Sequence, residues 1–378
     1  MKIPATAVGG FVHGQSMITR MIMSTIPIQR LHNQQLVHSK LRKPSDVVAQ
    51  LVVVQAQDYA GGKWSIGLRL SGSTDLQIEQ AIADKTFVRT WALRGTLHFV
   101  AAADVHWLLS LIAARIIARN ARVYRKLELD EHTLARSNAA VAKALRGGRQ
   151  LNRTELIAHL ERSGFSTKGL RAVYMLQRAC LDRLICQTVM YRNDPTYISL
   201  DQLAPTAKRV GRAEAVAELA KRYFTTRSPA TLQDFIWWSG LAPADARAGL
   251  EAIQSRLSRE TIAGKTYWLS RSVAVQPDRS STALLLSSYD EYLLSYKDRT
   301  ASIHLEHIKK LAARNGFLST IVINGRVVGT WRRTFKKSAV VIEANLFAPP
   351  TASTDRALAA ASRRYGQFVG KPVELIWQ

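Results

Sequence analysis

Leu51-Val-Val-Val-Gln-Ala-Gln-Asp-Tyr-Ala-Gly-Gly62 is the stretch around which the chain is organised. The apolar run 47–54 before it predicts a buried helix or the end of a buried strand. The run stops at Gln55, and the glycine pair at 61–62 breaks any regular element that would continue it. The chain therefore changes abruptly here from a buried platform to a polar segment.

Gln55 and Gln57 leave this platform with one small residue between them. If the backbone is extended there, both side chains point to the same face. Each carboxamide offers an oxygen acceptor and two N–H donors, so the pair could hold one water molecule or one sugar-phosphate group. Spacing alone favours a simpler interpretation, in which polar loop residues follow a helix C-terminus and cap the backbone.

The residues around this stretch follow a pattern of helices and a hairpin. Apolar spacing predicts helices over 28–41, 44–54 and 76–83, and β-rich runs at 87–91 and 96–100 predict a hairpin. Three helices followed by a hairpin are typical of a winged helix, a helix-turn-helix variant. The same order recurs twice further along the chain, which indicates repeated architecture without repeated sequence.

This recurrence predicts a mainly α chain with β-hairpin wings (α+β), in which three tandem winged-helix domains precede a different C-terminal unit. A chain of 378 residues is also too long for one simple core. We expect a poorly packed N-terminal extension (1–27), winged helices at 28–146, 147–205 and 206–280, and a β-rich α+β unit (281–378). We expect the last unit to pack against the first winged helix.

The charge of the chain narrows the class of its partner. It has 53 Lys and Arg against 28 Asp and Glu, a formal net charge of +25. Such an excess indicates a polyanionic partner, with nucleic acid as the first candidate and an acidic membrane surface as the second. The hydrophobic content of 47% is that of a globular protein and excludes a wholly disordered chain.

Motifs for metals, disulfides and membranes are missing from the sequence. Cys180 and Cys186 do not make a disulfide framework, and no Cys-x-x-Cys or His-x-x-x-His spacing suggests zinc. No apolar run reaches the length of a membrane span, and residues 1–27 lack the pattern of a signal peptide. We therefore expect a cytoplasmic protein without a bound metal.

Four blocks of the sequence resemble the AlkZ/YcaQ-type DNA glycosylases. The segment 55–57 resembles their QΦQ motif, and the similarity extends to Thr90–His98, Tyr289–Arg299 and Val322–Arg333 in the family's order. Gln at the second polar position is similar to the AlkZ-like branch, whereas the YcaQ-like branch typically carries QΦD. The resemblance covers most of the chain after residue 28.

This resemblance implies a C-shaped scaffold with a basic concave channel and a β-hairpin that contacts DNA. It implies hydrolysis of the N-glycosidic bond of alkylated purines such as N7-alkylguanine, and the unhooking of interstrand crosslinks, with water as nucleophile and no cofactor. The partner would be double-stranded DNA with alkylated bases, bound by a nucleoid-associated monomer. Gln55 and Gln57 would be catalytic by orienting the water and facing the cationic sugar with partial negative charge, since an amide oxygen is too weak a base to remove a proton.

Residues in the matched blocks and in the predicted wings are candidates to contact DNA. Each charge alone is more simply a solvated surface group, but the group as a whole favours phosphate binding. The candidates are Arg94, Thr96, His98, Lys168, Arg171, Asn324, Gly325, Arg326, Arg332, Arg333, Lys336 and Lys337, with Arg89, Arg149 and Arg153 as further phosphate contacts. We expect the Asn324-Gly325 hairpin tip to enter a groove. For His98, a phosphate contact, an ordering role beside the glutamines and a buried structural role stay open.

Two other functions also stay open. The first is a non-enzymatic winged-helix DNA-binding protein, regulatory or architectural, which a lesion-independent and sequence-specific footprint would identify. The second is a metal-dependent nuclease, because Asp290 and Glu291 are adjacent carboxylates that could bind Mg²⁺. No third acid follows at a convincing spacing, so we expect these carboxylates to form salt bridges that fix the C-terminal unit to the first domain.

Overall fold

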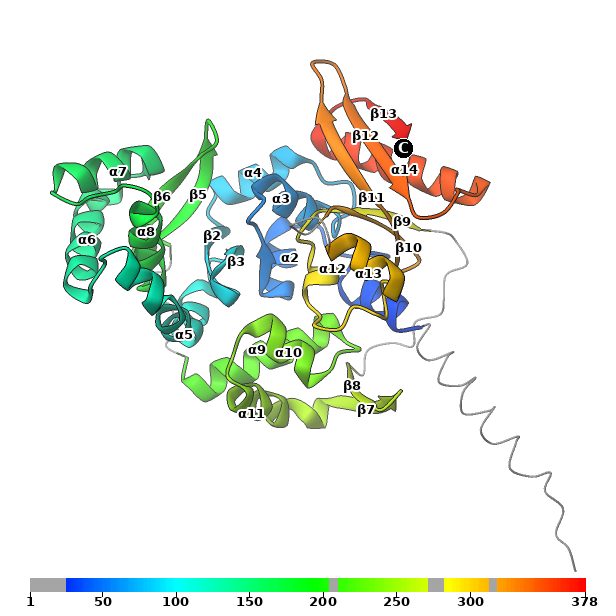
Figure 1. Ribbon diagram of the computed structural model, residues 1–378, viewed down its shortest axis with the longest axis horizontal. Helices are drawn as coiled ribbons and strands as arrows, with labels where there is room; N and C mark the ends of the chain where they lie inside the picture. Colours follow the sequence, from blue (N-terminus) through cyan, green and yellow to red (C-terminus); the bar gives the residue numbers. More distant parts are fainter. Residues whose placement is uncertain (1–24, 204–209, 271–281, 313–317) are drawn as a thin grey trace, which may run out of the picture.

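The segment that carries the glutamines lies near the centre of the computed structural model, which describes residues 25–203, 210–270, 282–312 and 318–378 (Figure 1). A helix over residues 25–33 precedes it. The elements that follow are α2 (Pro44–Leu51), β1 (Val53–Gln55), α3 (Tyr59–Gly67), α4 (Asp75–Ala83), β2 (Phe87–Trp91), a 3-10 turn η1 (Leu93–Gly95) and β3 (Leu97–Ala101). Thr74 begins α4 with a capping box to Gln77, which satisfies N–H groups of its first turn.

Helix α2 ends earlier than the apolar run predicts. The helix predicted over 44–54 is wrong after Leu51, because Val52 adopts a φ of 68° and residues 53–55 pair with β3. In this apolar run, Val47, Val48 and all residues from Leu51 to Val54 are buried. Periodicity cannot distinguish helix from strand in a segment that is buried on all sides. The backbone at Gln55 is therefore extended.

The second lobe contains α5 to α8 and joins the central strands in one sheet. Its elements are α5 (Val105–Lys126), α6 (Glu131–Ala144), η2 (Arg146–Gly148), β4 (Leu151–Asn152), α7 (Arg153–Arg162), α8 (Arg171–Leu181), β5 (Ile185–Tyr191), β6 (Asp194–Ser199) and η3 (Leu200–Gln202). The sheet order is β1-β3-β2-β5-β6-β4. Arg89 of β2 is opposite Gln187 of β5, and this pairing connects the two halves of the sheet.

The third lobe is helical and ends in a separate hairpin. It consists of α9 (Arg212–Arg227), α10 (Leu232–Ser239), α11 (Pro243–Ile253), η4 (Gln254–Arg256), β7 (Leu257–Ile262) and β8 (Lys265–Ser270). Gly240 ends α10 in the left-handed conformation that glycine adopts without strain. In Figure 1 this lobe lies below the central segment and next to α5.

The C-terminal lobe is a five-stranded sheet with helix α14 on it. Its elements are β9 (Ala283–Leu286), α12 (Glu291–Leu294), α13 (Leu305–Ala312), β10 (Thr320–Ile323), β11 (Arg326–Phe335), β12 (Val340–Leu346), α14 (Ala352–Val369) and β13 (Val373–Trp377). The order β13-β12-β11-β10-β9 is antiparallel except for β12 and β13. Trp64 of α3 packs on Tyr365 and Phe368 and donates its Nε1–H to the carbonyl of Leu285 (2.6 Å). The expected packing against the first unit is thereby confirmed.

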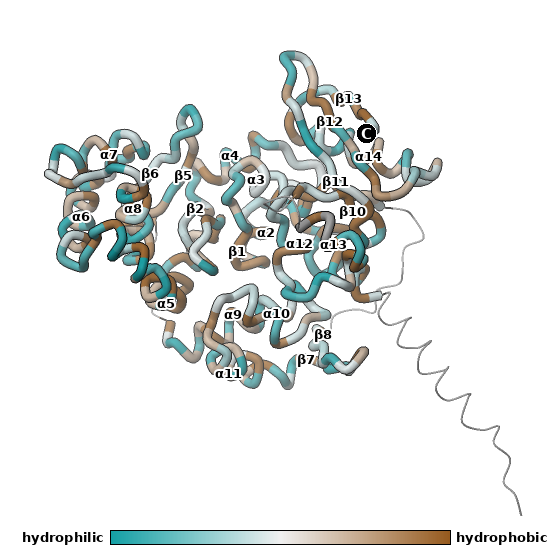
Figure 2. Tube along the Cα trace, in the orientation of Figure 1, coloured by the Kyte–Doolittle hydropathy of each residue, from teal (hydrophilic) through white to brown (hydrophobic). Residues whose placement is uncertain are grey.

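Strands β1, β2 and β3 separate two hydrophobic cores. Neighbouring residues Val53 and Val54 belong to different cores, and so do Phe99 and Val100. One core combines β1–β3 with α5 to α11, and the other combines them with α2 to α4 and the C-terminal sheet. In Figure 2 the buried strands β1 and β10 are hydrophobic, whereas the tips of the β5–β6 and β11–β12 hairpins are hydrophilic. A slip of one residue would exchange the faces of β1, so burial on both sides fixes its register.

The α+β class is confirmed, and the number of winged helices and their predicted boundaries stay predictions. Residues 1–24 of the predicted extension lie outside the described residues, whereas Ile26 is buried. None of the described helices is long and apolar enough to cross a membrane. Cys180 and Cys186 are free, buried thiols.

The hairpin tip expected to enter a DNA groove is packed on one side, although Asn324 itself is exposed. The turn at Asn324-Gly325 is packed: a Cβ at Gly325 would meet Pro27 at 2.5 Å, and the Gly325 carbonyl accepts a hydrogen bond from the hydroxyl of Tyr292 (2.6 Å). A hairpin of the same sheet that does project from the molecule joins β11 to β12, and its tip lies at the top of Figure 1.

Candidate active site

Gln55 and Gln57 lie at the end of β1 beside β3. Gln55 is opposite His98, and the N–H of Ala56 donates to the carbonyl of Leu97 (2.9 Å). The side chain of Gln55 is buried, and its Oε1 accepts from the N–H of Gln57 (3.0 Å). Gln57 is exposed, and its Oε1 accepts from the N–H of Leu97 (3.3 Å). The two side-chain oxygens thus extend the hydrogen-bonding beyond the last paired residue of β1.

These bonds orient both amides without using all their hydrogen-bonding groups. Each oxygen accepts one bond and has a second lone pair, and neither Nε2 group bonds to a residue that the structure describes. One amide is inside the protein and its neighbour reaches the surface. The pair can therefore bind a water molecule at the surface with an orientation that the interior fixes.

A buried carboxylate holds the backbone of Gln55 from behind. Glu291 Oε1 accepts from the N–H of Gln55 (3.2 Å), and Oε2 accepts from Arg227 (3.0 Å), Trp238 Nε1 (2.9 Å) and Ser295 (3.0 Å). Burial alone would raise the pKa of Glu291, but the guanidinium of Arg227 and these hydrogen bonds hold it below its usual value. Glu291 is therefore charged and fixes the start of the glutamine segment.

Asp290, the adjacent carboxylate, has a purely structural partner. Arg69 donates two hydrogen bonds to it, at 2.9 and 2.8 Å, and both side chains are buried. This pair ties the C-terminal lobe to the segment that follows α3, so the expected salt bridge to the first unit is confirmed. Among the residues that the structure describes, no group of three His, Cys, Asp or Glu side chains could hold a metal ion.

His98 faces Gln55 from the neighbouring strand and has no access to solvent. Its Nδ1 is 2.9 Å from the carbonyl of Thr96, and its Nε2 has no partner among the described residues. A side chain that is 0% exposed cannot reach a phosphate, so this proposed contact is wrong. Burial, helped by the charge of Arg94, lowers the pKa of His98 to about 4. The imidazole is neutral at physiological pH.

Acidification is expected to weaken the fold through His98. Its pKa is about 4 in the folded chain and about 6.5 in an unfolded one. The stability that the neutral form contributes is complete above about pH 6.5 and is lost as the pH falls towards 4. Urea unfolding should show roughly 2 kcal/mol of this loss between pH 7 and pH 5. His98→Asn should lack that part of the pH dependence, and equal pH dependence in both proteins would contradict this origin.

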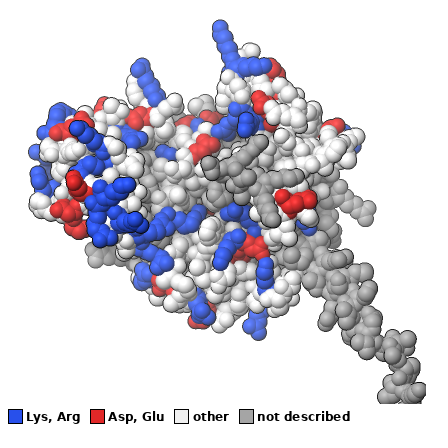
Figure 3. Space-filling view, in the orientation of Figure 1, with Lys and Arg blue, Asp and Glu red and all other residues white. Residues whose placement is uncertain are grey.

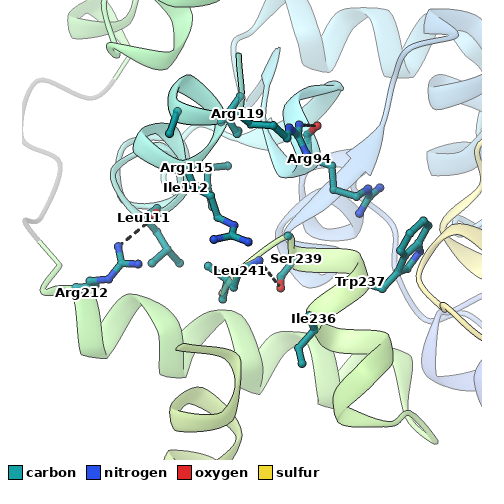
Figure 4. Close-up of a pocket in the computed structure, with 13 residues that line it drawn as sticks. Arg94, Leu111, Ile112, Arg115, Arg119, Arg212, Ile236, Trp237, Ser239 and Leu241 are labelled. Atoms are coloured by element: carbon teal, nitrogen blue, oxygen red, sulfur yellow. Dashed lines mark hydrogen bonds between the residues drawn. The ribbon is translucent and has the colours of Figure 1, made fainter. Parts of the chain in front are cut away.

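A pocket of about 540 Å³ opens beside these residues, between α5 and the end of α10 (Figure 4). Apolar side chains of both helices form much of its wall. Four arginines also line it: Arg94, Arg115, Arg119 and Arg212. Arg94 belongs to η1, three residues before the N–H that binds Gln57, and donates a hydrogen bond to the carbonyl of Trp238. The pocket and the glutamines are therefore neighbours.

Comparisons with known proteins decide the family. The family model described as DNA glycosylase AlkZ-like matches residues 48–368. The chain belongs to this AlkZ-like family of DNA glycosylases. It is 25% identical over 328 residues to the interstrand DNA cross-link repair glycosylase of Streptomyces sahachiroi, which covers 82% of this chain and 86% of that protein. The solved DNA glycosylase AlkZ of the same organism has a TM-score of 0.77 over 94% of this chain and 99% of its own, at 22% identity, and shows the same fold.

The resemblance of the sequence to AlkZ-like proteins is therefore confirmed. The matched range contains both glutamines, the block at 90–98 and the acidic pair at 290–291. The roles of single residues in this AlkZ-like chain stay predictions, because the match extends to the chain as a whole and tests no side chain.

Three of the candidates for DNA contact near the glutamines have internal partners. Arg89 is buried, and its Nε donates to the carbonyl of Ala56 (3.0 Å) and its Nη1 to Gln187 (2.7 Å), so the expected phosphate contact is wrong. Arg94 and Thr96 are half-buried. Thr96 donates to the carbonyl of Leu93 (3.3 Å), which shapes the turn before β3.

The remaining candidates lie on separate surfaces of the AlkZ-like fold. Lys168 is exposed, whereas Arg171 donates to the carbonyls of Ser166 (2.9 Å) and Leu127.

The candidates of the C-terminal lobe differ in exposure. Arg332, Lys336 and Lys337 are exposed on the β11–β12 hairpin, with Lys336 paired to Glu374 (2.6 Å). Arg333 lies 3.5 Å from Asp58. Asp58 caps α3 through the N–H of Gly61 (3.0 Å). Arg326 is exposed beside the packed turn, away from this hairpin tip.

Sequence reasoning missed the arginines of α5 and Trp237 of α10. Arg115, Arg119 and Arg122 are spaced i, i+4 and i+7, which places them on one helix face, and all three are exposed. This spacing was available in the sequence as a signal. The adjacent Trp237 and Trp238 could not be separated in this way, because only the fold decides which indole faces inwards.

Proposed function

We propose that this protein hydrolyses the N-glycosidic bond of alkylated purines in double-stranded DNA, with N7-alkylguanine as substrate class, and that it unhooks interstrand crosslinks. The family, and the name of the Streptomyces sahachiroi relative as an interstrand DNA cross-link repair glycosylase, support this proposal. The observation that carries it is the exposed amide of Gln57, whose orientation the buried Gln55, β3 and Glu291 determine.

The chemistry requires little acid catalysis and a well-placed water molecule. An N7-alkylated purine already carries positive charge, so it leaves readily and the sugar develops oxocarbenium character, as in glycoside hydrolysis. A carboxamide oxygen does not deprotonate water at neutral pH. It accepts a hydrogen bond from that water and presents partial negative charge to the sugar. We assign these two roles to Gln57 at the surface and to Gln55 behind it.

The DNA in this proposal is bound by cations and by the projecting hairpin. Lys and Arg side chains gather over the lobe of α5 to α8 and continue towards the centre of the face in Figure 3. The β11–β12 hairpin presents Phe335 (53% exposed) beside Lys336 and Lys337 at its tip. A hydrophobic side chain flanked by cations suits insertion into a groove. We assign to this hairpin the DNA contact that the sequence suggested for residues 324–326, in a protein that acts as a monomer.

The test is base release from a defined duplex. The purified protein is incubated in EDTA with a duplex that contains one N7-methylguanine, and alkali-labile abasic sites are then counted; a crosslinked duplex is analysed on a denaturing gel. We expect abasic sites at the methylated position and separated strands. Lesion-independent binding without base release would instead identify a regulatory or architectural protein. Strand cutting that occurs with Mg²⁺ and stops in EDTA would identify a nuclease.

A further inference from the structure

The pocket between α5 and α10 combines apolar walls with positive charge and has no acidic residue in the described part of its lining. Leu111, Ile112 and Ile116 from α5 face Ile236 and Leu241 across it. None of the described residues that line it is acidic, and Arg212 is the one lining arginine paired with a carboxylate, that of Asp245 (2.7 Å). A ligand that complements this pocket is flat or apolar and carries negative charge.

Arg115 is the lining cation that has no task within the described fold. It is exposed on α5 and makes no hydrogen bond or ion pair with a described residue. Figure 4 shows its guanidinium directed into the space between α5 and α10. Arg119, in contrast, donates to the carbonyl of Arg94. Arg115 is therefore free to contact an anion that enters the pocket.

Trp237 provides an aromatic surface on the same pocket. It is 41% exposed, whereas its neighbour Trp238 is fully buried and donates to Glu291. Figure 4 shows the guanidinium of Arg94 directed towards the Trp237 indole. Exposed aromatic rings next to cations are the surfaces on which nucleic-acid bases stack, and such stacking tolerates any base.

The pocket is close to the glutamines but does not contain them. The Cα atoms of Arg94 and Leu97 are at most about 11 Å apart, because three residues cannot span more, and the N–H of Leu97 binds Gln57. Neither Gln55 nor Gln57 lines the pocket. We take a nucleotide in the pocket to be the neighbour of the one whose sugar faces the glutamines, because the pocket has its own lining and neither glutamine belongs to it.

We propose that this pocket binds an unstacked nucleotide next to the alkylated one, with its base on Trp237 and its phosphate on Arg115. This inference rests on the proposed function for the position of the lesion. The vacated stacking position would leave the duplex open at the alkylated purine and give the attacking water access to the sugar. The pocket is thus a second DNA subsite, built by α5 and α10.

The test is a cycle that pairs a protein change with a DNA change and measures only binding. The duplex carries 2′-fluoro-N7-methylguanine, whose glycosidic bond resists hydrolysis, and the nucleotide next to it has its base or is abasic. Trp237→Ala should weaken binding of the complete duplex about 10-fold. The same substitution should weaken binding of the abasic duplex less than 2-fold, because that duplex lacks the base that would stack on Trp237. Trp237→Phe should restore most of the affinity.

Matched controls separate the subsite from general effects. Trp377 on β13 is also 41% exposed, and Trp377→Ala should leave both affinities unchanged. Arg115→Ala should lower the slope of log affinity against log salt by about one, whereas Arg247→Ala on α11 should not. The subsite would be overturned if Trp237→Ala weakened binding of both duplexes equally. It would also be overturned if Trp377→Ala weakened binding as much as Trp237→Ala does. Since base release is not measured, absence of glycosylase activity would leave this result interpretable.

Discussion

Gln57→Ala is expected to lower the single-turnover rate of N7-methylguanine release at least about 100-fold, the effect typical of removing one preorganised polar group from a transition state. The Gln57 amide is exposed, and its carbonyl-type oxygen accepts from the N–H of Leu97, so the variant removes a water-binding group without opening the core. Affinity for the methylated duplex should stay within about 3-fold, less than 1 kcal/mol. Base release is measured by alkaline cleavage and affinity by anisotropy.

Gln55→Ala separates orientation from surface contact. Gln55 is buried and accepts from the N–H of Gln57, so its loss leaves that N–H without this partner. The rate should fall as for Gln57→Ala, and the free energy of unfolding should also fall by about 1–3 kcal/mol. Gln80→Ala, an exposed glutamine of α4, is the matched control and should change neither quantity. Full base release by both Gln55→Ala and Gln57→Ala would reject the proposed roles of these amides.

The sequence was sufficient for the position of the glutamines but not for their surroundings. The apolar run before Gln55 predicted that it follows a buried platform, whereas the placement of both amides on one face stays a prediction, because β1 ends at Gln55. That Gln55 is buried and Gln57 exposed depends on β3 and on Glu291, a residue 236 positions away in the chain. Contacts between such distant residues follow from tertiary packing, and the local pattern of the sequence does not predict them.

The burial of the turn at 324–325, of His98 and of Arg89 was missed for the same reason, because it also depends on distant parts of the chain. Asn324-Gly325 is a genuine turn, with φ of 49° and 78°, and turn chemistry is local. Its exposure is not local: the helix over 25–33 covers this turn through Pro27, whereas the β11–β12 tip is left free. His98 in a matched block and Arg89 just before that block were likewise polar candidates, and the strands on both sides of them bury both. Sequence pattern located these elements, and only the fold decided which of them reaches the surface.

Glu291→Ala is expected to be the most destabilising of the substitutions considered. The side chains of Glu291 and Arg227 are both 0% exposed. Removal of the carboxylate leaves a buried guanidinium without a counter-charge, which costs about 3–5 kcal/mol. Trp238, Ser295 and the N–H of Gln55 lose their acceptor at the same time. Urea unfolding at pH 7 measures the effect.

A matched surface pair shows whether burial is the cause. Glu374→Ala breaks the exposed pair with Lys336 and should cost less than about 1 kcal/mol. Glu291→Gln keeps an acceptor oxygen and removes the charge, so it should be less destabilising than Glu291→Ala. Because the pKa of Glu291 is held below its usual value, its contribution is complete above about pH 4.5 and is lost as the pH falls further. A loss for Glu291→Ala as small as that for Glu374→Ala would contradict the role of this pair.

Glu291→Gln also tests the connection between this pair and the chemistry. If the carboxylate fixes the backbone of Gln55, a folded Glu291→Gln protein should bind the methylated duplex normally and release the base more slowly than wild type. Asp290→Asn is the appropriate comparison, because it weakens a buried pair with Arg69 without touching Gln55. An equal fall in rate for both variants would assign the effect to general loosening of the C-terminal lobe. A fall that is confined to Glu291→Gln would assign it to the position of the glutamines.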